Sequence, residues 1–141
     1  MKITEFKNEY SFLSNFYGSP ASFDGILYPT SEHAYQAAKT LSQEERNAIL
    51  AARTPAQAKK LGKKVTLRGD WNDVRINIMY EIITDKFNRN EILKKKLLET
   101  GDSELEEGNW WNDTFWGVCK NVGQNHLGKL LMKYRNENKV T

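Results

Sequence analysis

The chain has 141 residues, of which 21 are basic and 18 acidic, for a formal net charge of +3. This length suits a single domain spanning 1–141, the lone Cys119 excludes an internal disulfide, and no run of about 18 apolar residues indicates a membrane span. Because no signal peptide or Cys/His zinc spacing is visible, we expect a soluble cytoplasmic protein without a structural metal or cofactor.

The first third of the chain is typical of short strands and turns. Asp24-Gly25 lies between two apolar pieces, which predicts a β-hairpin. After it, the sequence SEHAYQAAK predicts a helix over Ser31–Lys39, started by Thr30 or Ser31 as the N-cap.

One face of this predicted helix is rich in polar groups. A helix turns about 100° per residue, so Glu32, Gln36 and Lys39 fall in one narrow sector, with Tyr35 at its edge. Two interpretations are open at this point. The face is either a chemical site or a solvated surface with an ordinary Glu/Lys arrangement.

Further helices follow in the middle of the chain. Ser42 and Glu45 have the spacing of a capping box, and Thr54 with Pro55 marks a helix start that ends at Gly62. The residues KVTLR, 64–68, predict a short strand. Two more helices are expected in the ranges 72–87 and 91–100, where the second contains the basic run Lys94–Lys96, interpreted as a solvated face.

The last third carries three more clusters. The acidic stretch 100–107 is either an acid–base site or an ordinary acidic loop, and strand alternation would put Leu105 and Glu107 on one face. The tryptophan-rich stretch 109–119 is either a stacking surface or an aromatic core with one exposed ring. Asn125 precedes a final helix, where it could help to bind an anion or simply cap the helix. Together these elements predict an α+β fold, helix-rich, with a small antiparallel sheet near the N-terminus.

Across nearly all of its length the sequence resembles the NADAR family, also called YbiA-like. The order and spacing of several segments carry this resemblance: FLSNFY (12–17), YPTSEHAYQAAK (28–39), TPAQAKKLG (54–62), RGDW (68–71), Met79 with Lys86 and Phe87, TGDSELEE (100–107), DTFWG (113–117) and GQNHLGKLLMKYR (123–135).

The resemblance implies a compact α+β domain that hydrolyses N-glycosides. Family members remove ADP-ribose from modified guanine in nucleic acid, or cleave phosphorylated early intermediates of riboflavin synthesis. The expected function is therefore hydrolysis of ADP-ribosylated guanine, with ADP-ribose as a product. The riboflavin-precursor reaction, a non-catalytic ADP-ribose or NAD sensor, and a structural nucleic-acid-binding domain are the alternatives. The chain departs from many relatives at Cys119, which bears on the aglycone.

Site roles carry over from the family motif residue by residue. The expected catalytic residues are Glu32, Lys39, Asp102 and Glu107. The expected substrate-binding residues are Asn15, Gln36, Asp70, Trp71, Trp116, Gly117, Asn125 and Arg135. Within this set we expect Lys39 to act as covalent or acid–base catalyst with Glu32 as its partner, and Asn125 and Arg135 to hold phosphates. No step needs a metal, so activity should survive EDTA.

Overall fold

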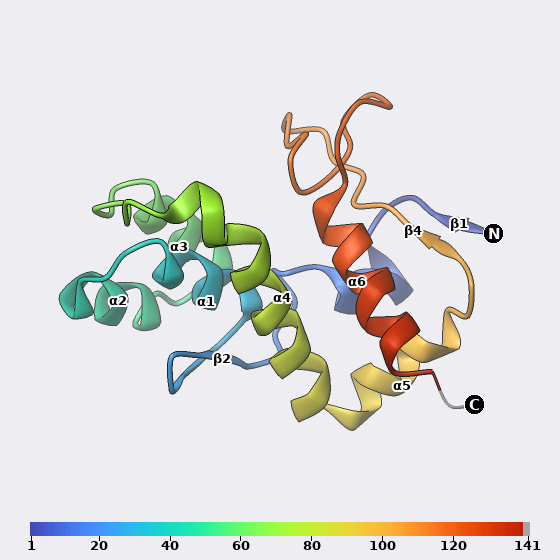
Figure 1. Cartoon of the computed structure of the whole chain (residues 1–141), viewed down its shortest axis with the longest axis horizontal. Coiled ribbons are helices and arrows are strands. Elements are labelled where there is room, and N and C mark those ends of the chain that lie inside the picture. Colours follow the sequence, from blue (N-terminus) through green and yellow to red (C-terminus); the bar gives the residue numbers. More distant parts are fainter. Residues whose placement is uncertain (140–141) are drawn as a thin grey trace. The chain divides into compact units, whose positions relative to one another are not determined.

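The computed structural model describes residues 1–139, and these fall into two compact units. The central unit is residues 15–89, and the terminal unit combines residues 1–14 with the described residues from 90 onward. Helices dominate both units, as expected for the predicted α+β class (Figure 1). Over the described residues, no helix is long and apolar enough to cross a membrane.

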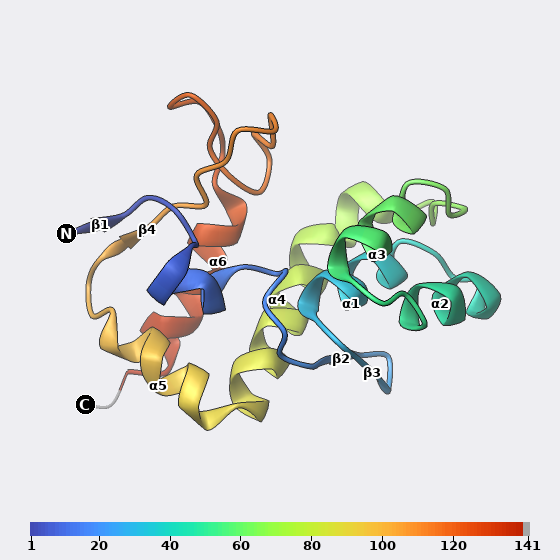
Figure 2. The same cartoon turned by 180° about the vertical axis from the view of Figure 1, so that it is seen from behind.

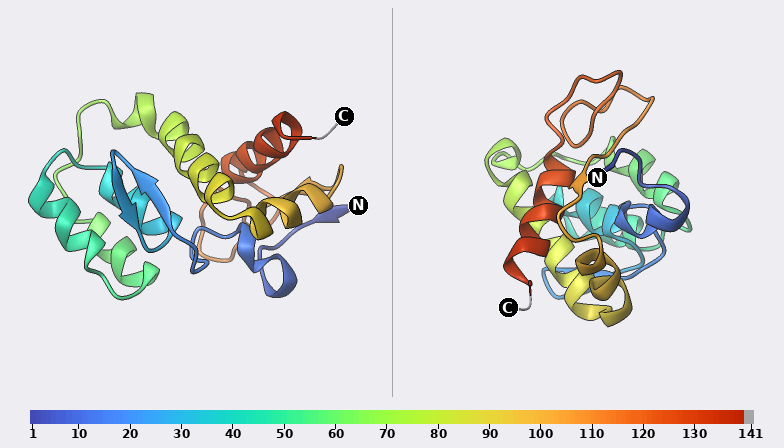
Figure 3. Two further views of the ribbon diagram at one scale, coloured as in Figure 1. Left: turned by 90° about the horizontal axis from the view of Figure 1, so that it is seen from below. Right: turned by 90° about the vertical axis from the view of Figure 1, so that its right-hand side faces the viewer.

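The central unit packs four helices with one β-hairpin. Its elements are β2 (Ala21–Phe23), β3 (Ile26–Tyr28), α1 (Ser31–Ala38), α2 (Gln43–Leu50), α3 (Pro55–Gly62) and α4 (Trp71–Arg89). The hairpin is antiparallel, as predicted, with Ala21 opposite Tyr28 (Figure 3, left). Asp24 and Gly25 both have positive φ, which is the turn geometry that matches the twist of paired strands.

Local signals set the helix starts in this unit. Thr30, Ser42 and Thr54 each accept a hydrogen bond from the backbone N–H three residues later, which confirms the predicted N-caps. The predicted capping box is only half formed, however. The Glu45 carboxylate accepts from the Thr40 hydroxyl and from Thr66 N–H, so it does not return to Ser42.

The strand predicted over 64–68 is absent, because its backbone groups have other partners. Thr66 N–H donates to Glu45 at 3.0 Å, and Arg68 N–H donates to the carbonyl of Lys39 at 2.7 Å. This segment therefore binds to the first turn of α2 and to the residue after α1 instead of forming a strand.

The terminal unit joins the two ends of the chain. It contains β1 (Lys2–Ile3), the 3₁₀ helix η1 (Asn8–Leu13), α5 (Glu91–Glu99), β4 (Glu104–Leu105) and α6 (His126–Glu137). Strands β1 and β4 pair in parallel, with Ile3 opposite Leu105, and lie side by side in Figure 2. The sequence did not predict this pairing. Between β4 and α6 the chain forms a long irregular loop beyond the start of α6 (Figure 3, right).

Candidate active site

The predicted site residues are divided between the two units. The central unit holds Asn15, Glu32, Gln36, Lys39, Asp70 and Trp71, and the terminal unit holds Asp102, Glu107, Trp116, Gly117, Asn125 and Arg135. Each group is described within its own unit.

The polar face of α1 is buried. Every residue from Ser31 to Ala38 is shielded from solvent, including Glu32 at 7% exposure and Gln36 at 3%. The Gln36 amide donates to a Glu32 carboxylate oxygen at 2.5 Å. This burial excludes the interpretation of a solvated face. A buried carboxylate needs a hydrogen-bond partner, and Gln36 provides one for Glu32.

Lys39 directly follows the last residue of α1 and is partly buried. Burial lowers the pKa of its ammonium group below the usual value, and the positive charges of Lys59 and Lys63 lower it further, whereas Glu32 raises it. The Lys39 ammonium lies 5.5 Å from the centre of the Tyr35 ring. Tyr35 and Trp71 pack with their ring centres 5.2 Å apart. The buried Trp71, the first residue of α4, therefore supports the Tyr35 ring that Lys39 contacts.

The packing of α1 explains why its polar side chains are held in place. The His33 ring contacts the Ala52 carbonyl at 2.9 Å through Nε2, and the Glu32 N–H donates to the Asn15 carbonyl at 3.0 Å. Gly62 of α3 lies directly against Gln36, where any Cβ would overlap the carboxamide. Gly62 thus allows α3 to approach α1 closely. Asn15 and Gln36 hold Glu32 in place through its backbone N–H and its carboxylate.

Asp70 forms an exposed ion pair with Arg68, with Nε and Oδ1 2.7 Å apart. Arg68 also donates to the Ala38 carbonyl at 3.4 Å, which satisfies a free carbonyl at the end of α1. The contacts of Asp70 in the central unit are therefore those of a structural residue, and its substrate-binding role stays a prediction.

In the terminal unit, Asn125 connects the acidic stretch to α6. Its side-chain oxygen accepts from Glu107 N–H at 3.0 Å, and its amide donates to the Leu105 carbonyl at 2.9 Å. A Cβ at Gly117 would overlap the backbone of Glu107, so these two residues are close neighbours. Glu107, Gly117 and Asn125 therefore form one cluster.

The start of α6 differs from both sequence interpretations. Asn125 has a left-handed backbone and makes no side-chain capping bond, so simple capping is wrong. The N–H groups of residues 124–127 each donate to one of the carbonyls of residues 114–117, at 2.8 to 3.3 Å, with Asn125 bonded to Gly117 and His126 to Phe115. Backbone donors that an anion would need at this helix start are already engaged.

Asp102 and Arg135 lie at the opposite end of α6. Asp102 pairs with Lys139 at 2.8 Å and its side chain is 91% exposed, and Arg135 donates to the Thr100 hydroxyl at 2.9 Å. At about 1.5 Å of rise per residue, Asn125 and Arg135 are separated by roughly 15 Å along the helix. Two side chains so far apart are poorly placed to hold one phosphate, and their predicted roles stay predictions.

The tryptophans of the long loop have different environments. Trp116 packs edge-on against Phe115, with ring centres 4.9 Å apart, and is partly buried. Trp110 and Trp111 also meet edge-on at 5.6 Å, but they are 78% and 44% exposed. The interpretation of an aromatic core with one exposed ring is therefore wrong, because two rings of this cluster reach solvent.

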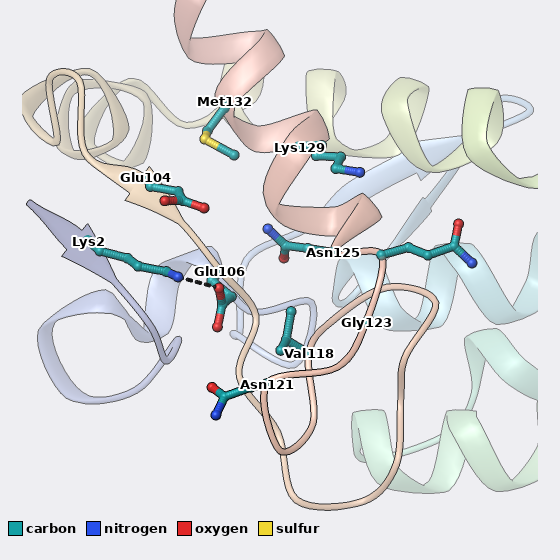
Figure 4. A pocket seen from close by; sticks show the side chains of 10 residues that line it. Lys2, Glu104, Glu106, Val118, Asn121, Gly123, Asn125, Lys129 and Met132 are labelled. Atoms are coloured by element: carbon teal, nitrogen blue, oxygen red, sulfur yellow. Dashed lines mark ion pairs between the residues drawn. The ribbon is translucent and has the colours of Figure 1, made fainter.

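A hollow of about 360 Å³ lies beside the start of α6 (Figure 4). Two lysines and two glutamates line it, with Lys2 and Glu106 paired at 2.9 Å, and Asn125 reaches it from the helix start. Its charges are balanced, so the hollow has no marked preference for an anion.

Three lysines of the central unit were missed as candidates by the sequence interpretation. Lys86 on α4 is 1% exposed, with its ammonium 5.2 Å from the Phe87 ring centre. The sequence feature that could have identified it is a lysine on the apolar face of a predicted helix. Lys59 and Lys63 belong to the run KKLGKK at 59–64, which contains four lysines, one more than the run noted at 94–96.

Comparisons with known proteins bear on the family to which this chain belongs. The NADAR domain sequence model matches residues 3–138 and so includes both units. An N-glycosidase of Nostoc punctiforme is 40% identical over 134 residues, which cover 91% of this chain and 85% of that protein. N-glycosidase YbiA of Escherichia coli strain K12 is 35% identical over 133 residues, which cover 92% of this chain and 82% of YbiA.

A riboflavin biosynthesis protein of Vibrio vulnificus is 39% identical over 131 residues, but these make up 91% of this chain and only 35% of that longer protein. The NMR structure of Escherichia coli YbiA matches with a TM-score of 0.86 at 33% identity, covering 97% of this chain and 83% of YbiA. Family model, relatives and fold all lead to the same conclusion: this chain belongs to the NADAR domain family.

Proposed function

We propose that this chain is an N-glycosidase, and that it removes ADP-ribose from guanine in nucleic acid. The observation that carries the proposal is the buried Glu32–Gln36 pair of α1 together with the partly desolvated Lys39 directly after that helix, on which the Glu32 charge acts. A binding module has no need to bury an acid and an amine side by side, whereas N-glycoside cleavage uses both. Relatives named N-glycosidases support the reaction type.

The chemistry follows from the charge that develops during cleavage. Breaking the bond between C1′ and the base nitrogen puts positive charge on the sugar, which a nearby carboxylate stabilises. The neutral Lys39 amine attacks C1′ as the bond to the base nitrogen breaks, and the proton that this amine then loses balances the one that the departing nitrogen takes up. Opening of the ribose ring converts the new C1′–N bond into an imine, and water hydrolyses it to release ADP-ribose and the free amine. The lowered pKa of Lys39 favours the neutral amine that this route requires.

Glu32 is the proposed electrostatic partner, oriented by Gln36, and Glu107 is a second proposed carboxylate in the terminal unit. Trp116 with Gly117 is proposed as a wall for the base. The riboflavin-precursor reaction remains a specific second candidate, because a relative carries a riboflavin biosynthesis name. Both substrates contain a ribosyl N-glycosidic bond, so they differ in aglycone and not in the bond cleaved.

The test is incubation with a guanine-ADP-ribosylated oligonucleotide, followed by mass spectrometry and by borohydride trapping of any imine. Wild type should release the ADP-ribose mass and give a trapped adduct on Lys39. Lys39→Ala and Lys39→Arg should lower kcat by roughly 10²–10⁴-fold without an adduct. Lys95→Ala, an exposed lysine on α5, is the matched control.

Near-normal turnover by both Lys39 variants would show that this lysine is not the catalyst. Turnover without any trapped adduct would favour direct attack by water, with Glu32 as the main catalytic group. An unchanged oligonucleotide would transfer the proposal to phosphorylated riboflavin precursors, tested in the same way. Binding of ADP-ribose with no turnover of either substrate would identify a sensor.

A further inference from the structure

A strongly basic segment of the central unit, residues 53–68, adjoins Lys39. Every charged residue from Arg53 to Arg68 is basic, although the chain as a whole has a net charge of only +3. The segment includes α3 and the residues after it, and four of its cations are the lysines of KKLGKK, 59–64. Such a concentration of one charge beside a candidate site calls for a physical explanation.

Packing brings the ends of α1 and α3 together. His33 contacts the carbonyl of Ala52 just before α3, and Gln36 lies against Gly62 at the end of α3. The two helices therefore run in the same direction, side by side. Lys39 and Lys63 each stand directly after the last helical residue, so both leave the same end of the helix pair.

Helical spacing selects which lysines of α3 face Lys39. Lys59 and the C-cap residue Lys63 are four residues apart and share one stripe, whereas one step of 100° turns Lys60 away from it and Lys64 lies beyond the helix. The charges of Lys59 and Lys63 both act on Lys39, which agrees with this placement. Three lysines thus come from the same end of the helix pair, and the Glu32 carboxylate that also acts on Lys39 accepts a hydrogen bond from Gln36.

We propose that Lys59 and Lys63 form the subsite for the phosphate of the substrate, beside the reacting carbon at Lys39. This inference rests on the proposed function and adds to it the residues that bind the phosphate of a phosphorylated N-glycoside, in which sugar carbon and phosphate lie on one small molecule. Lysine is well suited to this role, because an ammonium binds phosphate through charge-assisted hydrogen bonds.

The other candidate places for a phosphate are less suitable. Donors at the start of α6 are engaged with carbonyls of residues 114–117, and the hollow beside them has balanced charge. Arg135 is buried and tied to Thr100. The competing explanation for the lysines is stabilisation of the carbonyl end of α3, and that effect applies to Lys60 as much as to Lys59.

The experiment measures binding of ADP-ribose and of ribose 5-phosphate to the whole chain by isothermal titration calorimetry. The variant Lys59→Ala/Lys63→Ala is compared with Lys60→Ala/Lys64→Ala, which removes the same charge from the same segment. Circular dichroism and thermal melts check that both variants fold. We expect the first variant to lose about tenfold or more in affinity and the second to change by less than about threefold.

Equal losses in the two variants would overturn the subsite, because they would reflect general charge or helix-end effects. An unchanged affinity in Lys59→Ala/Lys63→Ala would also overturn it. A loss for ADP-ribose alone would assign the subsite to a diphosphate, and a loss for both ligands to any sugar phosphate. Failure of the proposed function appears separately: wild type would bind the phosphates with the expected lysine dependence yet turn over no N-glycoside.

Discussion

At the scale of single residues, two lysines of the central unit have lowered pKa values for the same physical reason. Burial disfavours the charged form of an amine. Lys39 is partly buried, whereas Lys86 is almost completely buried and its pKa falls to about 7. The settings differ, however. Lys39 has Glu32 and further lysines around it, whereas the Lys86 ammonium lies 5.9 Å from the Tyr17 ring centre and 5.2 Å from that of Phe87.

The buried Lys86 should make folding stability depend on pH. Its pKa is lower in the folded chain than the ordinary 10.5, so between about 7 and 10.5 the unfolded chain binds more protons. Stability should therefore rise with pH in this window, by up to about 1.4 kcal/mol per unit from this group. The cost of burying the charge is fully present below pH 7.

The measurement is urea denaturation of wild type and Lys86→Met at pH 6, 7, 8 and 9. Met should be favoured most at pH 6 to 7, and the difference should shrink as the pH rises. Lys95→Met on the surface of α5 serves as the control. A difference between wild type and Lys86→Met that stays constant with pH would contradict the prediction.

At the scale of elements, close helix contacts depend on glycines inside or at the end of helices. Gly62 allows α3 to approach Gln36, and Gly128 allows α6 to approach the backbone carbonyl of Leu105 in β4. A helix interior otherwise favours alanine over glycine by about 1 kcal/mol. The glycines are therefore explained by packing between elements and not by helix propensity.

Substitution of Gly128 by alanine should destabilise the terminal unit. The new methyl group would overlap a backbone carbonyl, which cannot rotate away as a side chain can, so β4 or α6 must shift. We expect a net loss of roughly 1–3 kcal/mol in the free energy of unfolding, despite the gain in helix propensity. Chemical denaturation measures it, with the exposed neighbour Lys129→Ala as the control. A Gly128→Ala variant as stable as wild type would disprove this packing argument.

At the scale of the whole molecule, the chain order and the units do not coincide. Residues 1–14 belong with the residues from 90 onward, so the terminal unit is completed by a segment from the other end of the sequence. Glu104, Glu106 and Gly108 donate backbone hydrogen bonds to the carbonyls of Met1, Ile3 and Thr4. The surface ion pair of Lys2 with Glu106 adds little by comparison.

Deletion of residues 1–5 should therefore loosen the terminal unit selectively. Hydrogen–deuterium exchange should show faster exchange at the amides of 104–108, while α1 in the central unit keeps its protection. Lys2→Ala, which removes only the ion pair, should leave both regions close to wild type. Unchanged protection at 104–108 after the deletion would show that β1 does not support β4.

Much of the fold was predictable because its signals are local. The caps at Thr30, Ser42 and Thr54 and the turn at Asp24-Gly25 depend on neighbouring residues, so they could be found without knowing the partners of each element. Helical spacing, and then the family motif, grouped Glu32, Gln36 and Lys39. In the structure Gln36 donates to Glu32, and the Glu32 charge acts on Lys39.

Tertiary structure decided what depends on distant residues. The parallel pairing of Ile3 with Leu105 joins positions far apart in the chain, and the strand expected at 64–68 failed because Glu45 took its backbone donor. Burial of the polar face of α1 likewise depends on α3 and on Asn15. A sequence records which groups are present and how they alternate, but desolvation and hydrogen-bond competition depend on which segments meet. The burial of the polar face of α1 by distant segments is what makes it a candidate active site.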